Sequence, residues 1–316
     1  MTPLRLGVVG LGRLAEVGYL PAIRSLHGVV ELAGVADRLV SRCTTLAPDV
    51  PGFAGTGALV HGVELDLVVV ATPPGRHVLD AGAAADAGVA TLVEKPPAAT
   101  VTEALALNAL TPRPWIGLDR RFDPSVARLR ETIDAFVPPL ELRLAMSVRP
   151  ASWRPVTPPP PVLLDLGPHV VDLAGWLTRT GPAAVRGARV TESEASFELE
   201  LDSGVARLAL SHRRPWQESI VVEDAEGRGV RLVRGGRLRR AALRARRGGP
   251  SPLVATLAEQ LRAVCVALRG DAPDERLATA EDGVALLGAL AAAEASAADG
   301  GRRVEVVPGA VAPSSP

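Results

Sequence analysis

The sequence predicts an α/β chain in which an N-terminal doubly wound parallel sheet is followed by a C-terminal α+β domain with a largely antiparallel, open sheet. Over the first 120 residues, short apolar runs alternate with longer amphipathic stretches. This alternation is typical of parallel strands that are covered by helices on both faces. Beyond about residue 140, strand-like runs follow one another through short joints such as Asp202-Ser203-Gly204. Joints of that length favour antiparallel hairpins.

The composition indicates a globular, cytoplasmic protein. The 316 residues are 47% hydrophobic and 22% charged, which allows two domains with cores of their own. Because 35 basic residues balance 35 acidic ones, we expect no general nucleic-acid binding. The longest apolar helical stretch, Gly283–Ala293, is about half a bilayer span, so we expect no membrane partner. A strand expected from Arg5 onward leaves no signal peptide before it. Cys43 and Cys265 are too far apart in sequence to suggest a disulfide framework or a metal site.

The first domain is expected over residues 1–120, with strands and helices in alternation. Each expected strand is a continuous apolar run, as burial on both faces requires. The expected strands are Leu6–Val9, Leu32–Ala36, Leu67–Ala71, Thr91–Val93 and Trp115–Leu118, and the expected helices lie near 14–26, 39–46, 76–88 and 100–110.

The second domain is expected over residues 121–307, before a disordered tail at 308–316 that is rich in proline, serine and alanine. Its expected strands are Leu140–Val148, Arg186–Thr191, Ala195–Leu201, Val205–Ser211, Ser219–Glu223, Gly229–Val233 and Arg303–Val307. Its expected helices lie near 163–177, 252–268 and 279–298.

A single lysine, Lys95, stands among 34 arginines. It lies in Glu94-Lys95-Pro96, just after an expected strand, and the carboxyl ends of such strands form the ligand-binding edge of a doubly wound sheet. A guanidinium stays charged at any workable pH, whereas an ammonium can give up a proton. A lysine kept in a chain that otherwise uses arginine therefore indicates a chemical role, with a solvated surface group as the alternative.

A glycine-rich turn, Gly10-Leu11-Gly12-Arg13-Leu14-Ala15, joins the first expected strand to the first expected helix. The first glycine permits the tight turn, the second lets the backbone approach a pyrophosphate, and Ala15 allows close helix–strand packing. The N–H groups at the helix N-terminus then face the phosphates. Asp37 ends the second expected strand, where a carboxylate can accept hydrogen bonds from ribose hydroxyls. These features predict a dinucleotide site of the Rossmann type.

The same acidic residue favours NAD over NADP, because Asp37 would repel a 2′-phosphate. The adjacent Arg38 could instead bind that phosphate, so NADP stays open. Asp37 could also cap the helix expected from residue 39.

A candidate acid/base group lies in the sequence Leu163–Asp172. Asp165, His169 and Asp172 are spaced by four and three residues, so in a helix they share one face. A carboxylate beside an imidazole stabilises its protonated form and fixes its orientation, which suits a general acid/base. The alternative is a histidine on a helix face, with Asp165 as the N-cap and Pro168 in the first turn.

Several motifs together resemble the glucose–fructose oxidoreductase/inositol dehydrogenase (Gfo/Idh/MocA) family of nicotinamide-dependent oxidoreductases. The resemblance covers nearly the whole chain and is carried by Gly10–Ala15, Ala71-Thr72-Pro73, Glu94-Lys95-Pro96, Gly117–Phe122 and Asp165-Leu166-Gly167-Pro168-His169. It implies hydride transfer between nicotinamide and a secondary alcohol or ketone of a sugar-like or polyol substrate, which is sometimes linked to a nucleotide. It also implies a homodimer or homotetramer formed through the C-terminal sheet.

The resemblance implies roles for individual residues. Lys95 would bind the reacting oxygen and help to move its proton, His169 would be the principal acid/base, and Asp165 its partner. The expected NAD(P) contacts are Gly10, Gly12, Arg13, Leu14, Asp37, Arg38, Ala71, Thr72, Pro73, His77, Glu94, Lys95 and Arg121. The expected substrate contacts are Lys95, Trp153, Arg154, Asp165 and His169, and no metal ligand is expected.

Some features leave the substrate and the reaction open. A proline run, Pro158–Pro161, replaces a segment that is usually glycine-rich in this family, and Asp119 stands where many members carry asparagine. The nine arginines between 228 and 247 form either a solvated hairpin or an anion-binding patch. Alternative functions are reduction of a C=N or conjugated bond, glycoside cleavage that recycles the cofactor, and dinucleotide sensing without catalysis.

Overall fold

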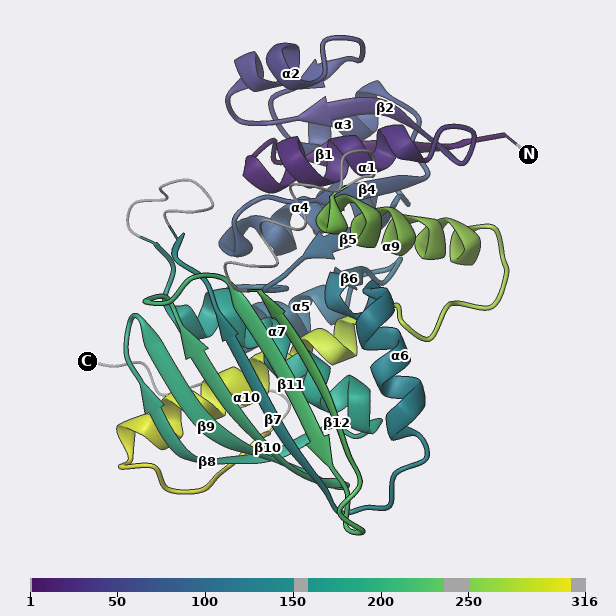
Figure 1. Cartoon of the computed structure of the whole chain (residues 1–316). Helices are drawn as coiled ribbons and strands as arrows, with labels where there is room; N and C mark the ends of the chain where they lie inside the picture. Colours follow the sequence, from purple (N-terminus) through teal and green to yellow (C-terminus); the bar gives the residue numbers. More distant parts are fainter. Residues whose placement is uncertain (1, 151–158, 236–250, 308–316) are drawn as a thin grey trace. The chain divides into compact units, whose positions relative to one another are not determined.

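The computed structural model of the chain describes residues 2–150, 159–235 and 251–307 (Figure 1). The predicted substrate contacts Trp153 and Arg154, the tail at 308–316, and most of the arginine cluster lie outside these residues. Contacts divide the chain into unit 1, Met1–Phe122 with Pro250–Val284, and unit 2, Asp123–Gly249 with Ala285–Pro316.

Unit 1 contains a six-stranded sheet with the order β3-β2-β1-β4-β5-β6, in which every neighbouring pair is parallel. The chain runs outward in one direction from β1 to β3 and in the other from β4 to β6, as a doubly wound sheet does. This confirms the predicted parallel sheet and adds one short strand, β3. The strands are β1 (Leu4–Val9), β2 (Val30–Ala36), β3 (Gly52–Phe53), β4 (Leu67–Val70), β5 (Ala90–Glu94) and β6 (Trp115–Gly117).

The helices of unit 1 include one that comes from far along the chain. Helix α9 packs against α1 and against the short helical turns η1 and η3. The approach is close, since a Cβ added to Gly18 would lie 2.7 Å from Cδ1 of Leu257. The helical elements are η1 (Ala15–Tyr19), α1 (Leu20–Ser25), α2 (Val40–Leu46), α3 (Thr56–Gly62), η2 (Pro74–Arg76), α4 (His77–Asp86), α5 (Val101–Asn108), η3 (Asp119–Phe122) and α9 (Pro252–Leu268).

Unit 2 contains a seven-stranded sheet with the order β12-β11-β7-β10-β9-β8-β13. Its pairs are antiparallel except for β7 and β10, which run parallel. The predicted, largely antiparallel sheet is thus confirmed. The strands are β7 (Leu140–Ser147), β8 (Pro182–Val190), β9 (Glu194–Leu201), β10 (Gly204–Ser211), β11 (Gln217–Glu223), β12 (Gly229–Gly235) and β13 (Val304–Glu305).

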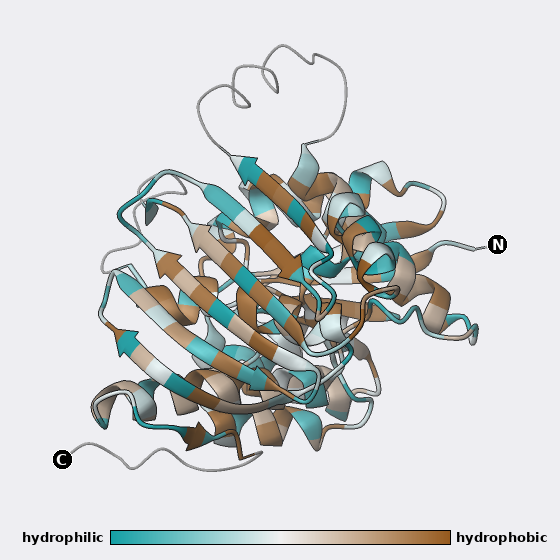
Figure 2. Cartoon of the chain, turned by 60° about the horizontal axis from the view of Figure 1, so that its bottom comes forward, coloured by the Kyte–Doolittle hydropathy of each residue, from teal (hydrophilic) through white to brown (hydrophobic). Residues whose placement is uncertain are grey.

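One face of this sheet is covered by helix α7 (Val162–Thr178), which packs against β7, β9 and β10 (Figure 1). Hydrophilic and hydrophobic residues alternate along the strands (Figure 2), as a sheet with one buried face requires. Leu142 and Leu208 belong to the buried set, while Arg143 and Arg207 on the same strands are exposed. The other helices within the described residues are α6 (Pro124–Ile133) and α10 (Ala280–Ala298). Helix α10 meets α7 where Leu290 lies against Gly167.

The start of α7 differs from one expectation. The helix begins at Val162 after Pro161, so Asp165 lies inside the first turn and is not the N-cap. Pro168 consequently lies within the helix, beyond its first turn. An acidic residue in the first turn still interacts favourably with the helix dipole.

Within the described residues, no helix combines the length and the hydropathy that a bilayer-spanning segment needs. In the same part of the chain, no group of three histidine, cysteine or acidic side chains converges as metal ligands would.

Candidate active site

The glycine-rich turn leads directly from β1 into η1. Gly10 has φ of 87°, in the region that favours glycine, and a Cβ there would lie 2.6 Å from the carbonyl oxygen of Ala71. A Cβ added to Gly12 would meet nothing within 4 Å, so the turn is open at this position. The first N–H groups of a helix lack carbonyl partners within that helix. The turn therefore fits a pyrophosphate, the group that its sequence predicts.

Asp37 supports this turn from the end of β2. Its Oδ2 accepts a hydrogen bond of 2.8 Å from the backbone N–H of Leu11, and its Oδ1 accepts one of 2.8 Å from Leu39. The carboxylate is buried, while the neighbouring Arg38 is exposed. Helix α2 begins at Val40 with Leu39 as its N-cap, so Asp37 holds the helix start from outside the cap position. The predicted ribose contact of Asp37 stays a prediction.

The loop after β4 is held by buried side chains of α4. The ring of His77 lies between two backbone carbonyls, with Nε2 2.7 Å from the oxygen of Thr72 and Nδ1 3.1 Å from that of Pro97. Burial lowers the pKa of His77. The hydroxyl of Thr72 donates to Asp80 at 2.8 Å. His77 therefore connects the loop after β4 with the loop that carries Lys95, whereas its predicted cofactor contact stays a prediction.

Lys95 is half-buried just after β5, and it follows Glu94, which is hydrogen-bonded to Tyr19. The hydroxyl of Tyr19 donates to Oε1 of Glu94 at 2.6 Å, and the backbone N–H of Lys95 donates to Oε2 of Glu94 at 3.0 Å. Burial raises the pKa of Glu94 to about 7, against the lowering effects of the Tyr19 hydrogen bond and of the charge on Lys95. The carboxyl group beside Lys95 therefore titrates near neutral pH.

The turn η3 carries the predicted cofactor contact Arg121 and Asp119, the residue that departs from the family pattern. Asp119 is half-buried, and its charge also raises the pKa of Glu94. Arg121 is buried and forms an ion pair with Asp282, with Nη1 3.3 Å from Oδ2. Elsewhere in unit 1, Arg13 pairs with Glu16 at 3.2 Å, at the start of the helix that follows the glycine-rich turn.

In unit 2, the candidate acid/base residues lie on α7. Asp165 and His169, four residues apart, are on the same face of this helix and are both partly exposed. Oδ2 of Asp165 lies 3.0 Å from Nε2 of a second histidine, His212, which directly follows β10 and is buried. The backbone N–H of His212 donates to the carbonyl of Ser193 at 2.8 Å, which fixes its position. The contact with His212 therefore holds Asp165 at the carboxyl end of β10.

Tyr19 and His212 take part in these contacts but were not among the predicted site residues. Tyr19 lies in η1, a turn of π-helix, and such turns are frequent at functional sites. His212 follows a strand whose carboxyl end lies beside that of β7, because the two strands are parallel. Tyr19 is the chain's one tyrosine, and this composition could have marked it as a candidate site residue. His212 is one of five histidines, and no feature of the sequence distinguishes it in a comparable way.

Comparisons with known proteins identify the family of the chain. Residues 4–113 match the GFO_IDH_MocA model, which describes an oxidoreductase family with an NAD-binding Rossmann fold. A UDP-N-acetylglucosamine 3-dehydrogenase of Acidithiobacillus ferrooxidans is 31% identical to the chain over 71% of this chain and 75% of its own length. The chain belongs to the Gfo/Idh/MocA oxidoreductase family. Unit 1 accordingly carries the NAD-binding Rossmann fold of this family.

Other Gfo/Idh/MocA relatives match less of the chain. The rhizopine catabolism protein MocA of Rhizobium meliloti is 31% identical over 62% of this chain, and the match spans 63% of that relative's length, which is less than two thirds.

Solved structures agree with the fold of the Gfo/Idh/MocA chain. GenD2 from gentamicin A biosynthesis, solved in complex with NAD, aligns with a TM-score of 0.80 and 23% identity over 96% of this chain and 97% of its own. A Lactobacillus casei myo-inositol dehydrogenase, in complex with NAD(H) and myo-inositol, aligns with a TM-score of 0.78 and 16% identity over 99% of both chains. At these identities the similarity concerns the fold alone.

Proposed function

We propose that the chain is an NAD(P)-dependent oxidoreductase that transfers a hydride between its cofactor and a secondary alcohol or ketone of a sugar-like or polyol substrate. The observation that carries this proposal is the chain's single lysine, Lys95, at the end of β5 in a member of this oxidoreductase family. Curated relatives include dehydrogenases named for UDP-N-acetylglucosamine, inositol and galactose, which supports a substrate with several hydroxyl groups.

In this function, His169, Lys95 and Asp165 would each have a separate role. A bound nicotinamide supplies the site that accepts or returns the hydride. In the oxidative direction, His169 takes the proton of the substrate hydroxyl, and the ammonium of Lys95 stabilises the oxygen as negative charge develops on it. Asp165 lies 3.0 Å from His212 and shares with His169 one face of α7, where it would act as the partner of that histidine.

A substrate panel tests this function. The purified chain is mixed with NAD or NADP and with myo-inositol, galactose or UDP-N-acetylglucosamine, and formation of the reduced cofactor is followed by its absorbance. We expect turnover with at least one of these polyhydroxylated compounds, and a higher kcat/KM with NAD because Asp37 carries a negative charge where a 2′-phosphate would lie. Tight cofactor binding without turnover of any polyol, or of the corresponding ketones with reduced cofactor, would contradict the proposal and favour a dinucleotide sensor.

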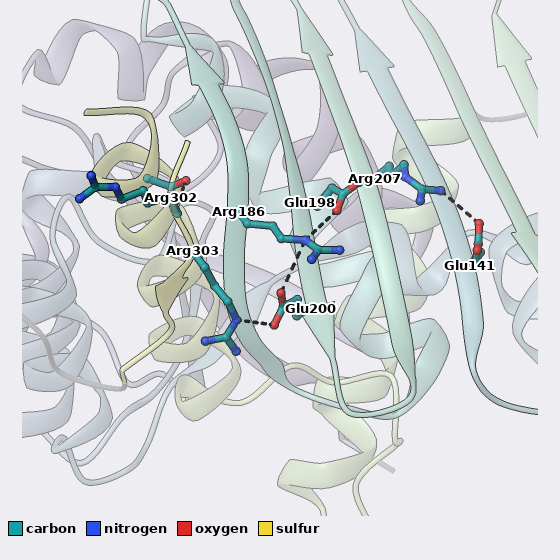
Figure 3. A network of polar contacts seen from close by, with 8 residues as sticks. Glu141, Arg186, Glu198, Glu200, Arg207, Arg302 and Arg303 are labelled. Atoms are coloured by element: carbon teal, nitrogen blue, oxygen red, sulfur yellow. Dashed lines mark hydrogen bonds and ion pairs between the residues drawn. The ribbon is translucent and has the colours of Figure 1, made fainter. Parts of the chain in front are cut away.

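We also propose that the open face of the unit 2 sheet pairs with a second copy of the chain. This face carries a network of alternating charges (Figure 3), in which Arg207 lies 3.1 Å from both Glu198 and Glu141. Arg186 lies 2.9 Å from Glu198, and Arg303 lies 2.8 Å from Glu200. A surface with interspersed charges of both signs can complement itself about a two-fold axis.

Sedimentation at low and high ionic strength checks this assembly. We expect a dimer or tetramer at about 0.1 M salt, and partial dissociation at about 1 M, where the Debye length falls to about 3 Å. Replacement of Arg207 by glutamate is expected to weaken the assembly at low salt. A monomer at all salt concentrations, with or without this substitution, would show that the face has another role.

A further inference from the structure

The chain's one tyrosine, Tyr19, is connected to its one lysine, Lys95, through the carboxylate of Glu94. Tyr19 is fully buried, and its hydroxyl donates to Oε1 of Glu94 at 2.6 Å. The other oxygen of that carboxylate, Oε2, accepts the backbone N–H of Lys95 at 3.0 Å. One carboxylate thus connects η1, which follows the glycine-rich turn, to the backbone of the lysine.

The side chain of Glu94 is buried and closely packed. Its exposed fraction is 6%, and a Cβ added to Gly117 on β6 would lie 2.9 Å from Oε1 of Glu94. Any residue with a side chain at position 117 would therefore displace the carboxylate. A carboxylate in such a place is costly unless it receives hydrogen bonds, and Tyr19 and Lys95 each supply one.

The charged groups around Glu94 have opposing effects. Burial and the charge of Asp119 on η3 raise the pKa of Glu94, the Tyr19 hydrogen bond and the charge of Lys95 lower it, and the net result is a pKa of about 7. Tyr19 in turn has its own pKa raised, first by burial and then by the charge of Glu94, so it remains a hydrogen-bond donor. The tyrosine hydroxyl and the backbone N–H of Lys95 are therefore neutral groups that favour the ionised form of Glu94.

We propose that Tyr19 is a positioning residue that acts on Lys95 through Glu94: its hydroxyl holds the carboxylate that in turn accepts the backbone N–H of Lys95. Without the hydroxyl, Glu94 takes up its proton at a higher pH than in the wild type, and the negative charge beside the Lys95 ammonium is reduced at neutral pH. This inference rests on the proposed function of Lys95 but concerns a residue outside the motifs that suggested that function.

The composition offers a direct readout. Because the chain has one lysine, growth on lysine labelled with ¹³C at the ε carbon gives a protein in which one side chain reports. In the wild type without substrate, the Lys95 signal is expected to shift with pH and to show a midpoint near 7, where Glu94 changes charge. In Glu94→Gln this inflection is expected to vanish.

Substitution at Tyr19 tests the proposal in two directions. In Tyr19→Phe the midpoint is expected to move up by roughly one to two pH units, because the ionised form loses a hydrogen bond. Uniform incorporation of 3-fluorotyrosine alters the chain at Tyr19 alone, leaves the packing nearly unchanged and makes the hydroxyl a stronger donor. It is expected to move the midpoint down.

Activity provides a second readout once a substrate is known. A shift of one unit lowers the ionised fraction of Glu94 at pH 7 from about a half to about a tenth. The kcat of Tyr19→Phe at pH 7 is therefore expected to fall roughly fivefold with KM nearly unchanged, and to recover as the pH rises toward 9.

Two results would overturn the inference. One is a pH dependence of the Lys95 ¹³C signal that is the same in the wild type, in Tyr19→Phe and in the fluorotyrosine protein. The other is an inflection near pH 7 that persists in Glu94→Gln, since another group would then be titrating. The labelled protein is titrated without substrate, so these outcomes do not depend on whether any compound is turned over. A failure of the inference is thereby distinguishable from a failure of the proposed function.

Discussion

Arginine in place of Lys95 is expected to lower kcat by about 10²- to 10⁴-fold, the range over which a positioned proton-transfer group contributes. The substitution keeps the positive charge but removes the group that can release a proton, and it replaces a compact ammonium with a planar fork. Since arginine keeps a positive charge at this predicted cofactor contact, the Kd for NAD is expected to change only a few-fold. Steady-state kinetics and calorimetric titration with NAD check the two expectations.

The control for this variant is the opposite exchange at an exposed position. Arg302 is 79% exposed in its side chain, and Arg302→Lys is expected to leave kcat unchanged. His169→Gln is expected to lower kcat by a similar factor to Lys95→Arg, and the double variant by little more than either single one, because groups that act in one step are not additive. Turnover of Lys95→Arg at the wild-type rate would exclude the role assigned to the lysine.

Methionine in place of Arg234 is expected to lower the free energy of unfolding of unit 2 by about 3–5 kcal/mol. Arg234 on β12 forms ion pairs with both Asp123 and Glu218, and the side chains of these acids are 10% and 2% exposed. Asp123 is also the N-cap of α6, where it accepts a hydrogen bond of 2.9 Å from Ser125. Removal of the guanidinium takes this positive charge away from two buried carboxylates.

Urea unfolding followed by tryptophan fluorescence measures this loss, with each unit fitted separately because a chain of two units need not unfold in one step. Arg143→Met is the matched control, since this arginine also lies on a strand of the same sheet but pairs with Glu223 at an exposed position. It is expected to cost about 1 kcal/mol or less. In Arg234→Met with Glu218→Met, part of the lost stability is expected to return, because one buried charge is removed as well. A loss in Arg234→Met no larger than in the control would mean that the acids find other partners.

Much of unit 1 could be predicted because its local signals agree with its long-range structure. The strand, the glycine-rich turn and Asp37 lie in one short segment, and the structure joins them through the hydrogen bond between Asp37 and Leu11. Lys95 could be selected because the composition made it an exception. In unit 2, the alternation of buried and exposed residues along β7 and β10 reflects a sheet with a single covered face.

Other features depend on contacts that the sequence pattern does not encode. The periodicity of α9 predicts a helix but not that it packs against α1 in unit 1. The pair of Asp165 with His212 requires α7 to pack against β10, a long-range contact that the sequence pattern does not indicate. Helix α6 is a different case, since its start carries recognisable signals, an Asp123 cap followed by proline, that the interpretation of the sequence did not use.

The proposed function requires that a hydride passes from a carbinol carbon of the substrate to the nicotinamide cofactor. The most direct test incubates it with oxidised cofactor and with the polyols of the panel, deuterated at their carbinol carbons, and determines the mass of the reduced cofactor. We expect the cofactor to gain one deuterium, with kcat for the deuterated substrate reduced where hydride transfer limits the rate. Lys95→Arg is expected to produce little labelled cofactor in the same time. Reduced cofactor without the label, or bound cofactor that is never reduced by any of the polyols, would contradict the proposed function.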